Sequence, residues 1–452
     1  MQSVTLETIY FDQSIRSYAL SLTGNTFDAD ELVSTAFEIC SSKSITGNLQ
    51  GYFATVMKNQ WLKRCNKKDI IDRIADQESV DIDGVLDRMY RYYSDILRAV
   101  YNGETLKDIH KGSTIPYRTL KEDYRKAKKE FKILHKDTKI ALILLSNSGV
   151  DYHRLTSPFS KLKFEYGIDV EIHWNKDDEF IHKLEDVTHV IFNRNISVNM
   201  QPERVIGALK LMGIKVICDI DDYWELESGH PLRNFYKVTN YTKCQIANMT
   251  LSDQVWTTTD LLATEVKRYN KNVHVVKNAI NNLDPQFNPD KIDLAFDTFF
   301  YSGGTTHRRD LKLLNSSFKD EKLLVKSPLV PKNMEATKVP VSKISEYAID
   351  YHTSGISVIP LRENKFNSMK SELKMIESGY FCKPCLVSYV APYTNLATNK
   401  NCIKVFNNDW TKAIKRIKGN LNLQVDLGMQ LKEDVESKYN LDKENRKRIQ
   451  LL

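Results

Sequence analysis

Short, continuous apolar runs alternate with helical segments over most of the chain after residue 137. Runs of this kind are typical of strands that are buried on both faces of a parallel sheet. A first series of five covers residues 139–145, 188–193, 215–220, 254–258 and 273–278. A second series of five covers residues 298–303, 322–327, 355–361, 384–390 and 402–407. The pattern predicts an α/β protein with two doubly wound, Rossmann-like domains that face each other.

The first part of the chain has a different pattern, because its apolar residues recur with a helical period almost throughout. The polar, proline-containing segment 281–291 separates the two strand series. We therefore expect an all-α domain over residues 1–137, followed by α/β domains over 138–288 and 289–452, the last of which ends in a helix.

Composition adds few constraints. The chain is 41% hydrophobic and 27% charged, as in ordinary globular proteins, and its net charge is only +7. No apolar run approaches the roughly 18 residues that span a bilayer, and the first residues lack the pattern of a secretory signal. The seven scattered cysteines favour a reducing compartment. We therefore expect a cytoplasmic protein without a membrane partner.

The segment FNSMKSELKMIE (366–377) carries two stripes if it is helical. Four apolar residues share one face: Met369, Leu373, Ile376 and Tyr380. The charged residues Lys370, Lys374 and Glu377 each follow an apolar residue by one position. They therefore form a second stripe, which is rotated by about 100° from the apolar stripe around the helix axis. They can form a solvent-exposed edge with an ion pair, or a site for the phosphates and the ribose of a nucleotide.

Glycines and polar residues follow the expected strands, and ligands of open α/β sheets bind beyond these carboxyl edges. The residues concerned are 146–149, 193–194, 219–222, 303–304, 360–362 and Ser388. Loops are polar even without a ligand. The presence of such residues after strands of both series nevertheless favours a binding cleft between the two domains.

Five segments, in order, carry a resemblance to a known family. They are GVDYHRLTSP (149–158), DIDDYW (219–224), VVKNAI (275–280), YSGGTTHRRDL (301–311) and the stretch 360–388. Together they resemble GT-B fold glycosyltransferases, closest to the large retaining family 4, over about residues 140–435. The resemblance implies a hexosyltransferase that uses a nucleotide sugar such as UDP-glucose, retains the anomeric configuration and needs no metal or other cofactor.

Residue chemistry and the resemblance together predict the donor-binding residues. They are Gly303, Gly304, His307, Arg308, Arg309, Lys370, Ser371, Lys374 and Glu377. Glycines let the backbone approach a diphosphate closely, and cations neutralise its charge. A helix that begins at Asn367 or Ser368 would add the positive end of its dipole, and Glu377 would accept the ribose hydroxyls. Met369 departs from the family, which often has a glutamate there, so the residue that contacts the transferred sugar is left open.

Three residues are candidates for catalysis: Asp221, Asp222 and His153. The two aspartates can orient an acceptor hydroxyl or the donor sugar, but helix capping after a strand explains each of them equally well. His153 follows the first strand and can be structural instead. The resemblance implies no dedicated general base.

The amino-terminal part resembles small bacterial sigma factors. Residues 14–40 and 49–64 resemble their region two, and residues 96–131 resemble their region four, which contains a helix-turn-helix. Residues 104–139 contain 11 Lys/Arg against 6 Asp/Glu. On the expected second helix, the candidate DNA-binding residues are Tyr117, Arg118, Lys121, Arg125, Lys128 and Lys132. A solvated helix that links two domains is the alternative.

Three functions follow from this combination. The first is a glycosyltransferase that places a sugar on a hydroxymethylated base of bacteriophage DNA, which would make the chain a phage-encoded protein of the host cytoplasm. The second is a transferase that acts on a glycan, a lipid or a protein. The third is a sigma-like regulator with a degenerate transferase body. The expected partners are a nucleotide sugar and DNA, and no protein partner is evident.

Overall fold

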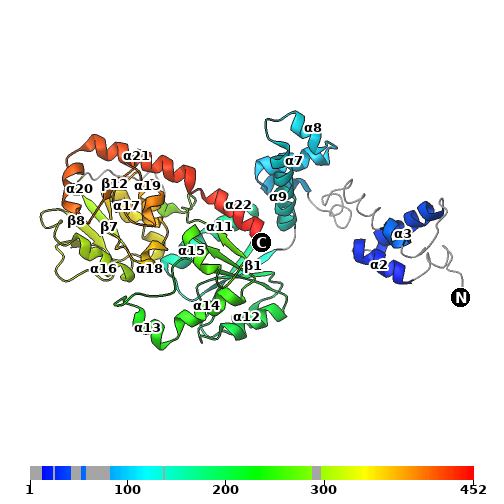
Figure 1. Cartoon of the computed structure of the whole chain (residues 1–452), viewed down its shortest axis with the longest axis horizontal. Helices are drawn as coiled ribbons and strands as arrows, with labels where there is room; N and C mark the ends of the chain where they lie inside the picture. Colours follow the sequence, from blue (N-terminus) through cyan, green and yellow to red (C-terminus); the bar gives the residue numbers. More distant parts are fainter. Residues whose placement is uncertain (1–12, 24–25, 42–51, 58–81, 136–137, 288–296) are drawn as a thin grey trace. The chain divides into compact units, whose positions relative to one another are not determined.

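The computed structural model describes residues 13–23, 26–41, 52–57, 82–135, 138–287 and 297–452 (Figure 1). The chain divides into two compact units, Met1–Lys132 and Ile133–Leu452. The sigma-like segment 49–64 lies largely outside the described residues.

The first unit is helical where it is described. Its helices are α2 (Gln13–Thr23), α3 (Thr26–Ser41), α6 (Ile82–Arg88), α7 (Arg91–Tyr101), α8 (Leu106–Lys111) and α9 (Tyr117–His135), and residues 52–57 are helical as well. Thr105 caps α8 in a reciprocal box with Asp108, which satisfies backbone donors at the start of this short helix. Leu120, Ala127 and Phe131 form the buried stripe of α9, so its remaining faces are free to carry charge.

The second unit contains two six-stranded, wholly parallel sheets. The first sheet has the order β2-β1-β3-β4-β5-β6, with strands Asp169–Trp174, Lys139–Leu144, His189–Asn193, Lys215–Ile220, Gln254–Thr257 and Val273–Val275. The second has the order β12-β11-β10-β7-β8-β9, with strands Ile403–Val405, Cys385–Ser388, Ile356–Ile359, Phe299–Ser302, Leu323–Lys326 and Thr337–Lys338. We call the residues around the first sheet (138–287) the first lobe and those around the second (297–440) the second lobe.

All ten predicted apolar runs form strands, and the predicted α/β class with two facing sheets is confirmed. The two strands that were missed, β2 and β9, are both at sheet edges. In β2, Ile172 is 48% and Trp174 is 50% exposed, although Val170 on the same face is buried. These two edge strands therefore lack the continuous apolar run that identified the other ten strands, which include the edge strands β6 and β12.

Helices cover both sheets. In the first lobe they are α10 (Gly149–Asp151), the π-helix η1 (Tyr152–Thr156), α11 (Ser157–Tyr166), η2 (Glu179–Lys183), α12 (Pro202–Leu211), α13 (Arg233–Val238), α14 (Tyr241–Leu251) and α15 (Asp260–Val266). Between the sheets and in the second lobe they are η3 (Pro285–Phe287), η5 (Thr305–His307), α16 (Arg308–Leu311), η6 (Lys312–Leu314), η7 (Ile344–Glu346), α17 (Ile349–Thr353), α18 (Lys365–Ser368), α19 (Leu373–Tyr380), η8 (Tyr393–Asn395), α20 (Trp410–Ile417) and α21 (Leu421–Lys438). The last helix, α22 (Leu441–Leu451), returns to the first lobe, where Asn445 donates to the Pro158 carbonyl at 3.0 Å (Figure 1).

The predicted continuous helix over residues 368–380 is wrong. The chain forms α18 and α19 with a break at 369–372, and Asn364 caps α18 by accepting the Asn367 amide at 2.8 Å. Asn367 and Ser368 therefore begin no helix. The break has a packing cause, because Phe366 and Met369 are drawn into the core of the first lobe against residues such as Trp224.

A buried ion pair joins the elements at the carboxyl edge of the first sheet. Arg154, on the π-helix, donates from Nε and Nη2 to Asp219 of β4 at 3.0 and 2.6 Å, and both side chains are almost fully buried. Nη1 donates to the Val276 carbonyl and to Asn278 Oδ1 at 2.8 and 3.0 Å. Burial opposes the charge on Arg154, but Asp219 keeps the pKa of the guanidinium above its ordinary value.

Removing the charge of Asp219 should destabilise the second unit strongly. Asp219→Asn leaves Arg154 buried without a counter-charge, which costs about 3–5 kcal/mol of unfolding free energy. Urea unfolding followed by tryptophan fluorescence measures this loss. Glu436→Gln, which breaks the exposed Lys432–Glu436 pair, is the matched control and should cost less than about 1 kcal/mol. Equal effects of the two changes would contradict the assigned role of the pair.

Candidate functional site

A cavity of about 710 Å³ lies between the two lobes. Its wall is built from the segments that follow β1, β3 and β4 in the first lobe and β7 and β8 in the second, together with residues of 370–377. The cavity therefore faces the carboxyl edges of both sheets, where open α/β sheets bind ligands. Its size is within the range of small-molecule sites.

Most of the predicted donor and catalytic residues line this cavity. They are His153, Asp221, Asp222, Gly303, Gly304, His307, Lys370, Ser371, Lys374 and Glu377. Two predicted residues are not among the lining residues. Arg308 is exposed, and Arg309 donates to the Ser228 carbonyl at 2.7 Å beside Glu227. The structure therefore gives these two arginines a place outside the cavity wall.

The two candidate catalytic aspartates are held by cations. Arg194 donates to both oxygens of Asp221 at 2.6 and 2.7 Å and to Asp222 at 2.8 Å. Lys370 of the second lobe donates to Asp222 at 2.8 Å. Burial opposes ionisation of Asp222, but Lys370 and Arg194 hold its pKa well below the ordinary value. No helix begins at these aspartates, so they are not helix caps.

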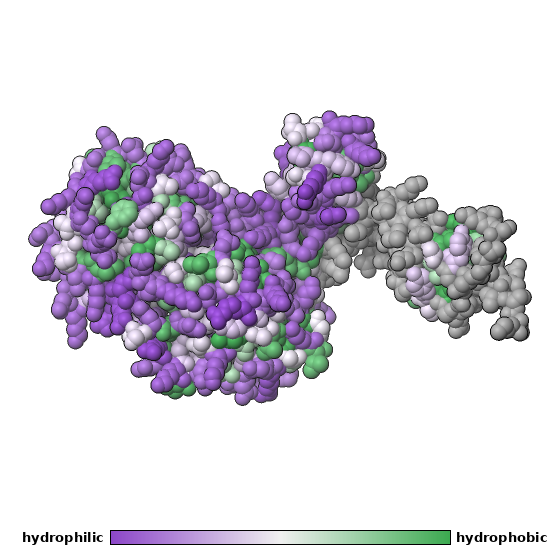
Figure 2. Space-filling view, viewed as in Figure 1, coloured by the Kyte–Doolittle hydropathy of each residue, from purple (hydrophilic) through white to green (hydrophobic). Residues whose placement is uncertain are grey.

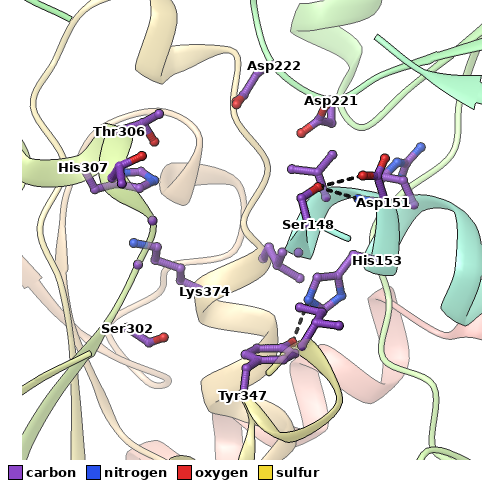
Figure 3. A pocket seen from close by; sticks show the side chains of 18 of the residues that line it. Ser148, Asp151, His153, Asp221, Asp222, Ser302, Thr306, His307, Tyr347 and Lys374 are labelled. Atoms are coloured by element: carbon purple, nitrogen blue, oxygen red, sulfur yellow. Dashed lines mark hydrogen bonds between the residues drawn. The ribbon is translucent and has the colours of Figure 1, made fainter. Parts of the chain in front are cut away.

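His153 and Glu377 are linked across the two lobes by a tyrosine. The Tyr347 hydroxyl lies 2.6 Å from His153 Nε2 and donates to Glu377 Oε1 at 2.7 Å (Figure 3). Because that hydroxyl has one proton, His153 must donate from Nε2. Tyr351 donates to the other oxygen of Glu377 at 3.1 Å. A carboxylate has about four acceptor positions, so Glu377 keeps capacity for a further ligand.

Lys374 differs from the other cations of the cavity wall. Among the described residues, no carboxylate lies within ion-pair distance of its ammonium group, which instead donates to Tyr301 Oη at 3.2 Å and lies 4.5 Å from the centre of that ring. Burial lowers its pKa from 10.5 to about 8, although Asp310 and Glu377 oppose the shift. Lys374 therefore remains mostly charged at neutral pH and has no paired anion.

The glycine pair lies beside this lysine. A Cβ atom on Gly303 would come within 2.2 Å of Tyr301 Oη and 2.8 Å of Lys374 Nζ, whereas one on Gly304 would meet nothing within 4 Å. Burial and the nearby Lys374 lower the pKa of His307 to about 4, although Asp310 accepts a bond from its Nδ1 at 2.8 Å. His307 is thus neutral at pH 7, and because its one N–H is donated to Asp310, its Nε2 can accept a hydrogen bond from a ligand.

Of the cavity residues that were not predicted from the sequence, Lys326, Tyr347 and Asp151 have partners that fix their side chains. Lys326, at the end of β8, donates to Ser342 at 2.7 Å and is paired with Asp350. Tyr347 belongs to a short turn without a motif. Asp151 accepts from Ser148 at 2.9 Å (Figure 3) and from Ser146 at 2.9 Å, and burial raises its pKa. The serine-rich strand end before Asp151 was noted as a cleft candidate, and it could have suggested this carboxylate.

The candidate DNA-binding residues lie along α9 in the first unit. Arg118, Lys121 and Arg125 are exposed, and Tyr117 and Lys128 are half-buried. Lys121 lies 4.8 Å from the centre of the Tyr117 ring. The side chain of Lys132 is outside the described residues. The basic residues are thus displayed away from the buried stripe of α9.

The chain is similar to several solved structures. Sucrose-phosphate synthase from Thermosynechococcus elongatus matches with a TM-score of 0.51 and 13% identity over 70% of this chain and 98% of that chain. Trehalose-phosphate synthase from Burkholderia vietnamiensis gives 0.49 and 8% over 70% and 98%, and Anabaena HepE with UDP-glucose gives 0.48 and 8% over 69% and 98%. The match with sucrose-phosphate synthase shows a fold of the GT-B type, as predicted.

Sequence comparisons add no relatives. No protein-family model and no curated protein matches the sequence. Nothing in the comparisons supports the sigma-factor resemblance of the amino-terminal part or DNA as a partner. Within the described ranges, no helix is both long and apolar enough to cross a membrane.

The two glycines should respond differently to alanine. Gly303→Ala should lower the unfolding free energy by about 1–3 kcal/mol, because the new methyl group would displace Tyr301 or Lys374. Gly304→Ala, the matched control, should be close to neutral because its backbone has an ordinary negative φ and the space is open. Thermal unfolding of both variants tests this difference, and a neutral Gly303→Ala would contradict the close packing.

Proposed function

We propose that the chain is a glycosyltransferase that takes a hexose from a nucleotide-sugar donor such as UDP-glucose. One observation supports this most: an unpaired lysine lies beside a glycine pair on the wall of an interlobe cavity. Backbone amides with a nearby cation are a standard arrangement for binding phosphates. The GT-B fold and the five ordered motifs agree with this assignment.

The donor is assigned mainly to the second lobe. Gly303, Gly304 and Lys374 would contact the diphosphate, with Lys370 within reach when it leaves Asp222. His307 and Ser371 would offer uncharged hydrogen-bonding groups on either side. Glu377 would accept ribose hydroxyls with the lone pairs that the two tyrosines leave free.

The first lobe would then hold the acceptor. During transfer, an acceptor hydroxyl oxygen attacks the anomeric carbon, the bond from that carbon to the diphosphate breaks, and its electron pair goes to the departing phosphate oxygen. The hydroxyl proton passes to the same phosphate oxygen. Asp221, Asp222 and His153 would position the sugar and the acceptor hydroxyl. Retention of configuration, which the resemblance implies, stays a prediction, and we assign no protein base.

For the acceptor, we propose a hydroxymethylated base of DNA. The exposed cations of α9 support this proposal, because phosphate contacts from such a helix would bring DNA to the enzyme. A base must leave the stack of a duplex to enter a cavity of this kind, or be presented on a single strand. A glycan, lipid or protein acceptor would leave the charge of α9 without a role.

Affinity for UDP should depend on the charge of Lys374. Below about pH 8 the lysine is already protonated, so it contributes no pH dependence. Above its pKa, binding must take up a proton, and affinity should fall up to about tenfold per pH unit. Lys374→Arg should bind UDP with little pH dependence up to about pH 9.5, and Lys374→Met should weaken binding at neutral pH about tenfold or more. Isothermal titration calorimetry in buffers of different ionisation enthalpy measures both effects.

Arg308→Met is the matched control for these titrations. It removes a cation that is close in sequence but exposed outside the cavity, so UDP affinity should not change. A wild-type protein that does not bind UDP, or a Lys374→Met variant that binds it normally, would refute the donor assignment.

DNA binding should require the basic face of α9. Lys121→Glu combined with Arg125→Glu should abolish a gel shift of duplex DNA at low salt, and the wild-type affinity should fall steeply as salt rises. The control is Lys412→Glu combined with Lys415→Glu on α20, which reverses two exposed charges elsewhere. If the wild type gives no shift at low salt, DNA is not the partner. If it does shift DNA, transfer of labelled glucose to hydroxymethylated DNA tests the acceptor itself.

A further inference from the structure

One short helix of the first lobe has no buried residue. Helix α13 and the start of α14 form a surface that we call the α13 platform, made of Leu232, Arg233, Phe235, Tyr236, Lys237, Val238 and Tyr241. Leu232, Phe235 and Val238 recur every three residues and are 36%, 48% and 82% exposed. Apolar side chains that share one face of a helix and remain exposed usually mark a binding surface.

The aromatic residues of the α13 platform continue into the interlobe cavity. Tyr241 lines the cavity, and the centre of its ring lies 4.6 Å from that of Tyr236 and 5.7 Å from that of Phe235. The three rings therefore form a continuous path from the cavity wall to the outer surface. The helix lies at the lower edge of the second unit in Figure 1, and apolar and hydrophilic atoms lie side by side over it in Figure 2.

The same surface is positively charged. From Ser228 to Ser252 the sequence contains three cations and not one aspartate or glutamate. Those cations, Arg233, Lys237 and Lys243, are exposed, and no described carboxylate lies within ion-pair distance of any of them. Flat rings between unpaired cations match a ligand that carries both planar rings and repeated negative charge.

We propose that the α13 platform binds a single-stranded stretch of nucleic acid, with bases stacked on Phe235 and its neighbours and phosphates on the cations. Base stacking on aromatic side chains and backbone contact with cations are how proteins hold single strands. This inference rests on the proposed function, because it would present the acceptor nucleotide at the cavity mouth. A neutral glycan could stack on the rings but would leave the three cations unused.

Fluorescence anisotropy of a short fluorescein-labelled oligothymidylate, with the full chain at low salt, measures this binding. Phe235→Ala should weaken it about tenfold, the loss expected for one stacked base. Arg233→Glu combined with Lys237→Glu should weaken it by at least about tenfold and reduce the salt dependence. Phe406→Ala, which removes an aromatic side chain that is 54% exposed in the second lobe, is the matched control and should have no effect.

Photo-crosslinking separates this surface from α9. An oligonucleotide that contains 4-thiothymidine should crosslink to residues 232–241, and mass spectrometry of the digested protein locates the site. Crosslinks confined to other segments, or platform variants that bind like the wild type, would overturn the proposal. UDP titration of the same variants should match the wild type and shows that they fold. If the wild-type protein does not bind UDP, the donor site is refuted. The oligonucleotide measurements still decide whether the α13 platform binds nucleic acid.

Discussion

The ion pair between Arg154 and Asp219 fixes the wall on which the rest of the site depends. Its atoms lie on the π-helix and at the end of β4, and the same guanidinium also contacts the loop after β6. Through Asn278, which donates to Ser371 at 2.7 Å, the network reaches the second lobe. A buried pair of this kind adds little net stability, since desolvation offsets the attraction. Its effect is to hold several strand ends in one arrangement.

Charge pairing on that wall decides what the cavity can accept. Asp221 and Asp222 would repel a diphosphate or a nucleic acid if they were unpaired, but Arg194 and Lys370 neutralise them. Because Lys370 belongs to the second lobe, its bond with Asp222 also holds the two lobes together. In the proposed function a diphosphate competes with Asp222 for Lys370, so donor binding and the contact between the lobes are coupled. Lys374 needs no such exchange, because it has no carboxylate to leave.

Sequence patterns were sufficient for the central strands but not for features set by tertiary contacts. Buried parallel strands are apolar throughout, so each run could be recognised without knowledge of its neighbours. The break between α18 and α19 could not, because it arises when Phe366 and Met369 pack against the opposite lobe. The spacing of Lys370, Lys374 and Glu377 fits one helix equally well, although only the last two belong to α19.

The same limit applies to the site. Motif order brought the glycine pair, the aspartates and Lys374 to one cavity. Adjacency in sequence grouped Arg308 and Arg309 with Gly303, but neither arginine is among the residues that line the cavity. Tyr347 was missed since nothing local marks a tyrosine that will contact Glu377 of its own lobe and His153 of the other. Pairing partners are properties of the fold, and a sequence motif specifies which charges are present but not which of them remain free.

In the first lobe, the wall of the cavity carries acidic residues and the rim carries cations, and this difference bears on the kind of acceptor that can bind. The carboxylates Asp151, Asp221 and Asp222 face the cavity, whereas residues 228–252 on and behind its rim carry only cations. A polyanion is therefore attracted to the rim, while the carboxylates inside, two of them already neutralised by Arg194 and Lys370, accept hydrogen bonds from a hydroxyl group. In the proposed function, a nucleic acid that presents one hydroxyl-bearing base would meet both conditions, since its phosphates would stay on the rim and only the neutral base would enter.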